Sequence, residues 1–421
     1  MRKPETIERL YMDFDGFFAS VEQQADRRLR GQPVGVVPFG GTDRTCVIAV
    51  SREAKVLGVK NVMTIKEAKN VCPDMIFVPQ KPDLYRRAHN ALVTEIETVL
   101  PIDTIKSIDE LICRLDNTAI QDPCGCSDKI KTRIRNYLGE SITVSIGFAA
   151  NRQLAKMACK AGKKQGRAYG NGFMVWYPQN MPLPLFKLEL SDIPGVGSHM
   201  HKRLLQARIQ TVEDLYNVEP KHMRKLWHNV TGERLWYALH GYAVEGTPSG
   251  VTRMVGHGRV LPPESRTLQS ARDIAWLLAT KAARRLRRAR LYTCGLSLWF
   301  SLKNDFWNHV VKLSFVNDDH AILAALNEGW RHAQSNLQSC RIFQVGVALI
   351  DLSSAHERQA DLFLDDDVER KKWETVASTI DYLNGKYGCT LISQGLWKPP
   401  SGGHAGGKIS FTRVPEQEDF W

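Results

Sequence analysis

The chain has 421 residues, of which 43% are hydrophobic and 24% are charged, and its formal net charge is +12. Because single hydrophobic cores rarely grow past about 250–300 residues, this length predicts several globular domains. No apolar run approaches the roughly 18–20 residues of a membrane span and no secretory-signal pattern is present, so we expect neither a membrane protein nor a secreted one. The nine cysteines are scattered, which predicts reduced thiols in the cytoplasm.

The positive charge is unevenly distributed along the chain. From residue 356 to the C-terminus, 8 Lys and Arg side chains stand against 11 Asp and Glu, so the first 355 residues carry a net charge of +15. A basic body of this kind predicts a polyanionic partner, either nucleic acid or an anionic membrane. Since no segment has the pattern of a membrane-binding amphipathic anchor, nucleic acid is favoured.

Two acidic side chains lie where the first predicted strand passes into the first predicted helix. We expect the strand at 7–14 and the helix at 17–30. Asp13 and Asp15 are two residues apart, so in a strand both side chains would lie on the same face. On their own, these carboxylates are better explained as solvated residues at a strand edge.

Basic side chains open a short helix in the next region. β-branched runs at 33–37 and 46–50 predict strands, and residues 51–59 predict a helix. Arg52 and Lys55 lie in the first turns of this helix, an arrangement suited to a triphosphate. Without other signals they would be solvated helix charges.

A second acidic pair, Asp109 and Glu110, follows a predicted helix at 84–100. Residues 105–115 are expected to form a strand pair or a single bent strand. Four carboxylates that converge at two strand ends repel one another unless divalent cations hold them together, and Mg²⁺ prefers such oxygen ligands. Two such ions can activate an attacking oxygen and stabilise a leaving one during phosphoryl transfer. Alone, this second pair is better explained as a polar turn.

Two later segments add candidate phosphate contacts. A helix rich in Ala and Lys is predicted at 151–163 and ends in Lys163, although such helices are commonly solvated surfaces. Gly195 and Gly197 lie in a Pro-Gly-Val-Gly turn before a predicted helix at 199–207, the pattern of a helix–hairpin–helix. The backbone N–H groups of such a turn bind phosphate and position a duplex without reading its sequence. The alternative is an ordinary turn between two helices.

The last large unit has the predicted order strand, helix, strand, strand, helix, strand. The strands are expected at 252–261, 292–301, 310–315 and 343–349, and the helices at 268–291 and 321–337. The end of the first of these helices holds six basic residues in ten and no acidic one. Because a solvated helix face normally mixes charge signs, the run predicts phosphate contacts by Arg284, Arg285, Arg287 and Arg288.

Taken together, these segments resemble the Y-family, the translesion DNA polymerases. The resemblance rests on Asp-Phe-Asp-Gly-Phe-Phe-Ala-Ser-Val-Glu at 13–22, Ser-Ile-Asp-Glu at 107–110, Asn-Arg-Gln-Leu-Ala-Lys at 151–156 and the turn at 194–197. It covers nearly the whole chain. It implies an α+β multidomain protein, a right-hand polymerase with palm, small fingers, helical thumb and little finger.

The same resemblance implies the domain boundaries. The palm would span residues 1–180, in two segments (1–29 and 74–180) that enclose the small fingers at 30–73. A helix–hairpin–helix thumb at 181–250, an α+β little finger at 251–355 and a C-terminal tail at 356–421 would follow.

The resemblance also implies roles for individual residues. Asp13, Asp109 and Glu110 would be the catalytic carboxylates and, with the backbone carbonyl of Phe14, would hold two Mg²⁺ ions. Asp15 would support them. The nucleotide would be bound by Phe17, Phe18, Arg52, Lys55 and Lys163, and the DNA by Gly195, Gly197 and the four arginines above.

Phe18 matches the steric gate, a ring that crowds the sugar 2′ carbon and excludes ribonucleotides; a core aromatic is the competing explanation. Arg52 and Lys55 depart from the commonest family segment, Tyr-Glu-Ala-Arg, because they stand at its Tyr and Arg positions. Lys55 is a point charge without the guanidinium fork. This Lys is closer to the UmuC-like branch, so the choice between DinB-like and UmuC-like branches stays open.

A pentapeptide just past the last unit resembles the Gln-Leu-x-Leu-Phe peptides by which bacterial polymerases dock on the sliding clamp. It reads Gln359-Ala-Asp-Leu362-Phe363. The two adjacent apolar side chains would fill a pocket while the Gln would form hydrogen bonds at the rim.

These observations predict a template-directed DNA polymerase of the translesion type. It would add dNTPs to the primer 3′ end of primer–template DNA, with low fidelity and no proofreading, as a cytoplasmic monomer active in damage tolerance. Two alternatives remain. One is a Y-family-like accessory DNA-binding protein with little or no catalysis, and the other is a helix–hairpin–helix nuclease.

Overall fold

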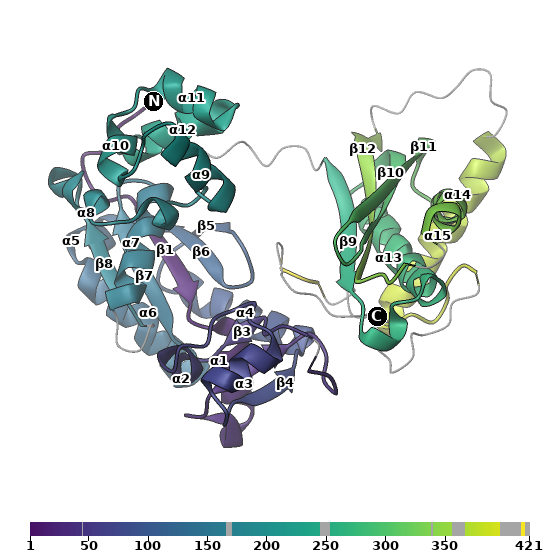
Figure 1. The fold of residues 1–421 in the computed structure, drawn as a ribbon, viewed down its shortest axis with the longest axis horizontal. Coiled ribbons are helices and arrows are strands. Elements are labelled where there is room, and N and C mark those ends of the chain that lie inside the picture. The colour runs from purple at the N-terminus through teal and green to yellow at the C-terminus, as the bar shows by residue number, and fades with distance from the viewer. Residues whose placement is uncertain are drawn as a thin grey trace. The chain divides into compact units, whose positions relative to one another are not determined.

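A computed structural model of the protein describes residues 1–43, 45–165, 171–244, 253–337, 340–355, 367–395 and 414–416. The chain divides into two compact units, one formed mainly by Cys46–Pro248 with Met1–Val37, and the other mainly by Ser249–Ser410. Figure 1 shows mixed helix and sheet in both. Across the described ranges, no helix combines the length and apolar character that a membrane span requires.

The first unit is built on a five-stranded sheet in the order β5-β6-β1-β7-β8. The strands are β1 (Arg9–Phe14), β5 (Ile102–Ile105), β6 (Glu110–Arg114), β7 (Val144–Ala149) and β8 (Phe173–Trp176). β1 pairs antiparallel with β6 and with β7, whereas β7 and β8 are parallel. The strand pair expected at 105–115 is therefore a hairpin, β5–β6, and its second strand lies next to β1.

Alternation along β1 decides which side chains face which helices. Leu10 and Met12 lie in a core shared with α1 (Phe17–Ala25), α4 (Pro82–Glu97) and α6 (Pro123–Tyr137), whereas Tyr11 lies in a core shared with α7 (Arg152–Gln165). Successive strand residues point to opposite faces, so Asp13 shares the face of Tyr11. The strand thus directs its carboxylate toward α7.

α7 packs unusually close to this face of the sheet. A Cβ added at Gly147 of β7 would lie 2.1 Å from the backbone nitrogen of Cys159, so only glycine admits the helix at this position. α7 contacts β1, β7 and β8. The lysines of the helix are therefore brought within side-chain reach of the acidic end of β1.

A small three-stranded sheet completes one end of the first unit. It consists of β2 (Val34–Val37), β3 (Ala49–Val50) and β4 (Ile76–Pro79) in the order β3-β2-β4, with α2 (Arg52–Val56) and α3 (Ile65–Val71). Ser51 caps α2, because its side-chain oxygen accepts from the backbone N–H of Ala54. The predicted helix start at Ser51 is confirmed.

The helix predicted at 17–30 is shorter than expected. It ends at Ala25, where extended Asp26 begins a 3-10 turn by accepting from the backbone N–H of Arg28. The helices at the other end of the unit are α8 (Leu183–Phe186), α9 (Ser198–Gln206), α10 (Val212–Asn217), α11 (Pro220–Trp227) and α12 (Val230–Leu239). A short helix α5 (Asn117–Gln121) precedes α6.

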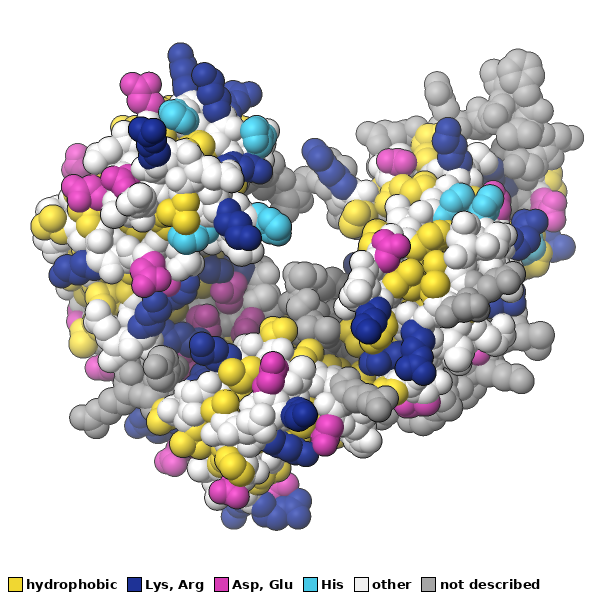
Figure 2. Space-filling model, viewed as in Figure 1, with side chains coloured by type: hydrophobic (Ala, Val, Ile, Leu, Met, Phe, Trp, Pro, Cys, Tyr) yellow, Lys and Arg dark blue, Asp and Glu magenta, His cyan; other side chains and the backbone are white. Residues whose placement is uncertain are grey.

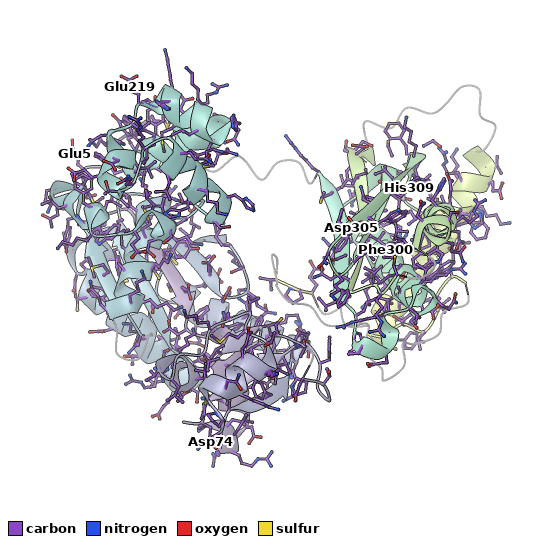
Figure 3. All side chains as sticks on the ribbon, in the orientation of Figure 1. Glu5, Asp74, Glu219, Phe300, Asp305 and His309 are labelled. Atoms are coloured by element: carbon purple, nitrogen blue, oxygen red, sulfur yellow. The ribbon has the colours of Figure 1, made fainter. Side chains whose placement is uncertain are left out.

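The second unit has one four-stranded sheet, in the order β11-β10-β12-β9, with helices on one side of it in Figure 1. Its elements are β9 (Met254–Val260), α13 (Leu268–Arg288), β10 (Leu291–Ser301), β11 (Phe306–Val316), α14 (Asp319–Leu337), β12 (Gln344–Ser354) and α15 (Asp367–Tyr387). The predicted order of strands and helices is confirmed. Phe300 lies in the core, edge-on to Trp330, while Asp305 lies in the turn between β10 and β11 (Figure 3).

α15 was not predicted, and it supplies acidic partners to the basic end of α13. Arg287 is only 9% exposed and forms ion pairs with Asp381 of α15 (2.6 Å) and Asp319 of α14 (3.1 Å). Arg284 also pairs with Asp381, at 3.3 Å. Carboxylates from sequence-distant helices therefore already hold these two arginines, and their contact with phosphate stays a prediction.

The other two arginines of that run also have neighbours within the second unit. Arg285 donates to the backbone oxygen of Gly256 (3.3 Å) and lies against His257, and Arg288 pairs with Glu416. Their proposed contact with DNA stays a prediction.

Candidate functional site

The structure brings the three predicted catalytic carboxylates to one end of the five-stranded sheet. Asp13 and Glu110 are directly opposite in the β1–β6 ladder. The backbone N–H of Phe14 donates to the backbone oxygen of Asp109 (2.9 Å), which fixes the turn before β6 beside the end of β1. Figure 2 shows acidic side chains of the first unit recessed among basic ones.

Asp13 has a lysine partner from α7. Lys163 Nζ lies 2.6 Å from Asp13 Oδ1 and 3.2 Å from Asp15 Oδ1. Burial raises the pKa of Asp13 to about 6, and the Asp109 and Asp15 carboxylates act in the same direction, while Lys163 opposes them. Burial alone would lower the pKa of Lys163, but the Asp13 and Asp15 carboxylates outweigh it and raise that pKa above its ordinary value. Asp13 and Asp15 therefore share the positive charge of one lysine.

Glu110 has a second lysine partner. Lys156 Nζ lies 2.8 Å from Glu110 Oε1 and 3.1 Å from Oε2, and it also lies over the Tyr11 ring. Burial and the nearby Glu110 carboxylate raise the pKa of Tyr11. Lys156 was not predicted as a site residue. Its spacing from Lys163, seven residues or two helical turns, is the signal that would have found it.

All four lysines along this face of α7 are paired with acids. Lys160 and Lys164 reach Asp192, at 3.1 and 2.8 Å. Burial alone would raise the pKa of Asp192, but the hydrogen bonds from Lys164 and Lys160 outweigh it and lower that pKa. The Lys-rich helix is therefore not simply a solvated surface. Lys156 and Lys163 hold carboxylates of the candidate site, and the other two lysines hold Asp192 before α9.

Asp15 is a fully buried support for this arrangement. It accepts from Thr143 Oγ1 (2.9 Å), Ser145 Oγ (2.8 Å) and the backbone N–H of Asn171 (2.6 Å). β1 ends at Phe14, yet Asp15 lies on the side of Asp13, as predicted: it accepts from Ser145, which is opposite Asp13 in the β1–β7 ladder, and it lies 3.2 Å from Lys163. Asp15 thus holds the starts of β7 and β8 and orients Lys163.

The donor set fits a hard divalent cation, with carboxylate and carbonyl oxygens at one sheet end. Across the described ranges, however, no group of three or more His, Cys, Asp and Glu side chains is close enough together to hold a metal. In this arrangement Lys163 holds Asp13, Lys156 holds Glu110, and Ser107 donates to Asp109.

Lys55 of α2 faces the same site from the small sheet. Gly16, with φ of +55°, lies between them: a Cβ there would meet the backbone oxygen of Val50 at 2.7 Å and the Lys55 ammonium at 3.8 Å. Burial and the neighbouring Lys163 lower the pKa of Lys55, while Asp15, Asp13 and Asp109 raise it. Arg52 starts the same helix and is partly exposed.

Phe18 lies in the first turns of α1 with 9% of its surface exposed. Its ring stacks on Tyr85, with centroids 4.4 Å apart and an interplanar angle of 12°. Tyr85 donates to the buried carboxylate of Glu22, which also pairs with Lys81 (2.7 Å). Phe17 is 3% exposed and packs in the core beside Phe14. The structure thus fixes the Phe18 ring rigidly from one side.

The predicted glycine turn precedes α9. Gly195 has φ of +98°, and a Cβ added at Gly195 or Gly197 would meet nothing within 4 Å. Gly195 lines a cavity of about 580 Å³ that also reaches Glu110, Lys106 and Lys156. The glycine turn and Glu110 therefore border one space within the first unit.

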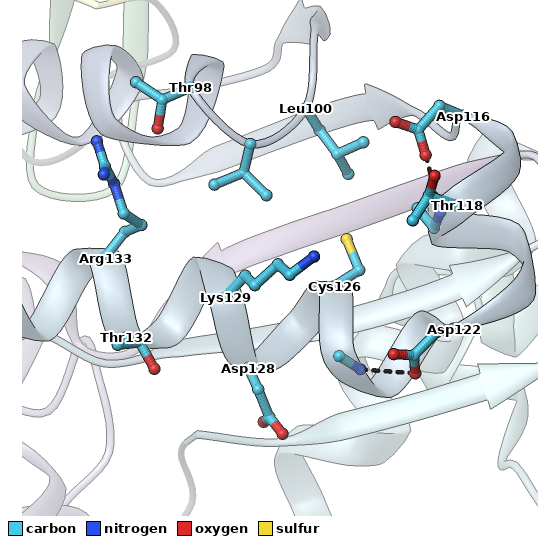
Figure 4. Close-up of a pocket in the computed structure, with 13 residues that line it drawn as sticks. Thr98, Leu100, Asp116, Thr118, Asp122, Cys126, Asp128, Lys129, Thr132 and Arg133 are labelled. Carbon is cyan, nitrogen blue, oxygen red and sulfur yellow. Dashed lines mark hydrogen bonds between the residues drawn. The ribbon is translucent and has the colours of Figure 1, made fainter.

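A different cavity, of about 630 Å³, lies at the ends of α4, α5 and α6 (Figure 4). Asp116 and Asp122 line this cavity, and each caps the start of a helix. Asp116 caps α5 by accepting from the backbone N–H of Ala119, and Asp122 caps α6 by accepting from that of Gly125. Of the predicted site residues that the structure describes, none lines this cavity. The clamp-like residues Gln359, Leu362 and Phe363 lie outside the described residues.

Comparison with known families gives three matches along the chain. Residues 12–160 match the impB/mucB/samB family, residues 252–362 match the C-terminal domain of that family, and residues 191–242 match the "DNA polymerase-iota, thumb domain". The matched segments contain the carboxylates, the glycine turn and the sheet of the second unit.

Curated relatives match over nearly their whole length. A DNA polymerase IV of Moorella thermoacetica is 29% identical over 399 residues, covering 92% of this chain and 95% of the relative. DNA polymerase IV of Oceanobacillus iheyensis is 26% identical, covering 97% and 95%. DNA polymerase IV 1 of Bacillus subtilis is also 26% identical, covering 91% and 92%.

Solved structures show the same fold. A Y-family DNA polymerase chimera of Dbh and Dpo4 superposes with a TM-score of 0.69 at 21% identity, covering 82% of this chain and 99% of that one. An insertion ternary complex of Dbh DNA polymerase gives a TM-score of 0.55 at 23% identity, covering 82% and 99%.

Proposed function

The chain belongs to the Y-family of translesion DNA polymerases, and we propose that it extends a primer 3′ end by template-directed addition of dNTPs. The observation that carries the proposal is the placement of Asp13 opposite Glu110, with Asp109 beside them and Lys163 and Lys55 on the flanks. Acidic side chains would hold metal at the reacting phosphate, and basic ones would neutralise the triphosphate.

Asp13, Asp109, Glu110 and the backbone carbonyl of Phe14 would hold two Mg²⁺ ions. When bound, these ions activate the primer 3′ hydroxyl and stabilise the leaving pyrophosphate oxygen. Lys163 then leaves Asp13 for the β and γ phosphates, and Lys156 leaves Glu110. The lysines keep the crowded carboxylates compatible with one another until substrate arrives.

The triphosphate would lie between α2 and α7, which contribute Arg52, Lys55 and Lys163. Phe17 and Phe18 lie on the adjoining start of α1. Because Tyr85 stacks behind Phe18, the ring resists displacement by a ribose 2′ hydroxyl, which is the property that a steric gate requires.

The surrounding chain would position the DNA. Backbone N–H groups near Gly195 and Gly197 would contact duplex phosphates, with Arg285 and Arg288 contributing from the second unit. We propose low fidelity, no proofreading, a role in damage tolerance, action as a cytoplasmic monomer, and docking on the sliding clamp through Gln359, Leu362 and Phe363.

The test is primer extension on an undamaged template with Mg²⁺, comparing wild type with Asp109→Ala/Glu110→Ala. The matched control, Asp74→Ala/Asp128→Ala, removes two exposed carboxylates elsewhere on the first unit. We expect extension by wild type and control and none by the test variant. Tight binding of primer–template without extension by wild type would support the accessory protein instead, and strand cleavage would support the nuclease.

A further inference from the structure

Five arginines line a cavity of about 450 Å³ at the opposite end of β1 from Asp13. They are Arg2 and Arg9 near the N-terminus, Arg114 at the end of β6, Arg152 at the start of α7 and Arg234 on α12. Among the described residues of the lining, Glu8 is the only acidic one. Arg9 is four residues from Asp13, or about 13 Å at the usual rise of a strand.

The acids near this cavity balance only part of the charge. Arg2 holds Glu8 through both of its terminal nitrogens, so Glu8 is already neutralised. Asp103 lies 3.4 Å from Arg152 and 3.9 Å from Arg9. Arg9 also lies 3.9 Å from Glu8. The lining holds five arginines against one glutamate, and Asp103 adds one carboxylate beside it, so positive charge is in excess around the cavity.

The sheet register places two of these arginines in an unfavourable position. Arg9 and Arg114 are directly opposite each other in the β1–β6 ladder, where like charges destabilise a sheet. The Arg9 side chain is only 15% exposed. Burial lowers the pKa of Arg9, and Arg114 and Arg152 act in the same direction, while Asp103 and Glu8 oppose them. Such repulsion is relieved when an anion lies between the guanidinium groups.

This cavity shares lining residues with the one beside Glu110. Asn151, Arg152 and Arg234 line both. The positive end of α7, a helix of 14 residues, opens onto the same space at Arg152. Basic groups thus continue from the carboxylates along the line where α7 and α12 meet.

We propose that Arg9, Arg114, Arg152 and Arg234 form a phosphate-binding site. Guanidinium groups bind phosphate oxygens in pairs, so four of them around one cavity suit a phosphate monoester, a phosphodiester or inorganic phosphate. The phosphate comes either from the backbone of the bound duplex, some nucleotides from the primer 3′ end, or from free phosphate in solution. The first source rests on the proposed function, and the second does not.

The first experiment measures DNA binding by fluorescence anisotropy without Mg²⁺, so that catalysis plays no part. The test variant is Arg152→Gln/Arg234→Gln, and the control is Arg135→Gln, an exposed arginine on α6. Primer–template duplexes carry one neutral methylphosphonate at successive primer or template positions. If a backbone phosphate occupies the site, one position weakens wild-type and control binding by about 10-fold but barely affects the test variant, which is the signature of coupling.

Free phosphate is tested by thermal melting of the DNA-free protein with and without inorganic phosphate. Arg114→Gln serves as a second variant, because it removes the like-charge pair and is expected to melt no lower than wild type without phosphate. A melting shift by phosphate that is lost in both variants, without coupling at any DNA position, identifies free phosphate as the source. If neither coupling nor a differential melting shift is found, the phosphate site is overturned, whatever the outcome of primer extension.

Discussion

Lys163 and Asp13, 150 residues apart in sequence, form an ion pair of 2.6 Å. The lysine thereby contacts the carboxylate that would bind metal in the proposed function. The same lysine lies 3.2 Å from buried Asp15. Lys163 thus has two possible partners within the site and a third, the triphosphate, during the proposed reaction. The polymerase would bind nucleotide and metal by exchanging one set of charges for another.

Replacing Lys163 tests this exchange. Lys163→Gln removes a charge-assisted contact worth roughly 1.5–3 kcal/mol, so we expect kcat/KM for single-nucleotide incorporation to fall about 10- to 100-fold. The matched control is Lys129→Gln, which removes an exposed lysine on α6. Unchanged kcat/KM in Lys163→Gln would show that this lysine contributes nothing to nucleotide binding or to the reaction.

Asp15 is predicted to stabilise the fold as well as the site. Asp15→Asn places an amide where three donors and Lys163 now meet a buried carboxylate, so we expect a loss of about 2–4 kcal/mol in the free energy of unfolding. Urea unfolding measures the change, with Asp128→Asn as the exposed control. A stability equal to wild type would mean that the carboxylate charge of Asp15 is not needed.

Phe18 is predicted to control sugar selection. Phe18→Leu shortens the side chain while keeping an apolar packing partner for Tyr85, and we expect the preference for dNTP over rNTP to fall by roughly 10-fold or more. The ratio of kcat/KM for dCTP and CTP measures it. Phe148→Leu, which changes a buried ring of β7 in the same core, should leave the ratio near that of wild type. A ratio unaffected by Phe18→Leu would make Phe18 simply a core residue.

Arg287 is predicted to hold the second unit together instead of binding DNA. Arg287→Gln leaves Asp319 and Asp381 without their shared partner, so we expect a destabilisation of about 3–5 kcal/mol. Thermal melting measures this loss, and DNA binding at a temperature where the variant is folded should keep the wild-type salt dependence. A reduced salt slope with unchanged stability would support the phosphate-contact prediction.

His89 is predicted to make stability depend on pH. It is 1% exposed with Nδ1 at 2.8 Å from the backbone oxygen of Ile108, and burial lowers its pKa, although that hydrogen bond and Asp109 oppose the shift. The unfolded chain therefore binds more protons below the ordinary His pKa of about 6.5, and stability is lost as the pH falls through that value.

Melting curves at pH 7.5 and 5.5 check the role of His89. Wild type should lose more stability between these two values than His89→Gln, whereas the exposed control His222→Gln should behave as wild type does. Equal losses in wild type and His89→Gln would mean that other groups produce the pH dependence.

Much of the architecture could be read from local pattern. Hydrophobic periodicity located the strands around Asp13 and Glu110 and the order of elements in the second unit, because a period of two or of 3.6 residues is set by the backbone itself. The Pro-Gly-Val-Gly turn could also be found, since its glycines carry the information within four residues. Recognition of the carboxylate pairs needed only their spacing and their order.

Contacts between distant segments could not be read in this way. Asp15 looks equivalent to Asp13 in sequence, yet the Asp15 side chain is fully buried among donors from distant segments, whereas 30% of the Asp13 side chain is exposed. The basic end of α13 looks like a phosphate surface until Asp381, 94 residues away, is placed against Arg287. Charge on a helix is visible in sequence, but its partner depends on packing, because an ion pair forms only between groups that the whole fold brings within a few ångströms.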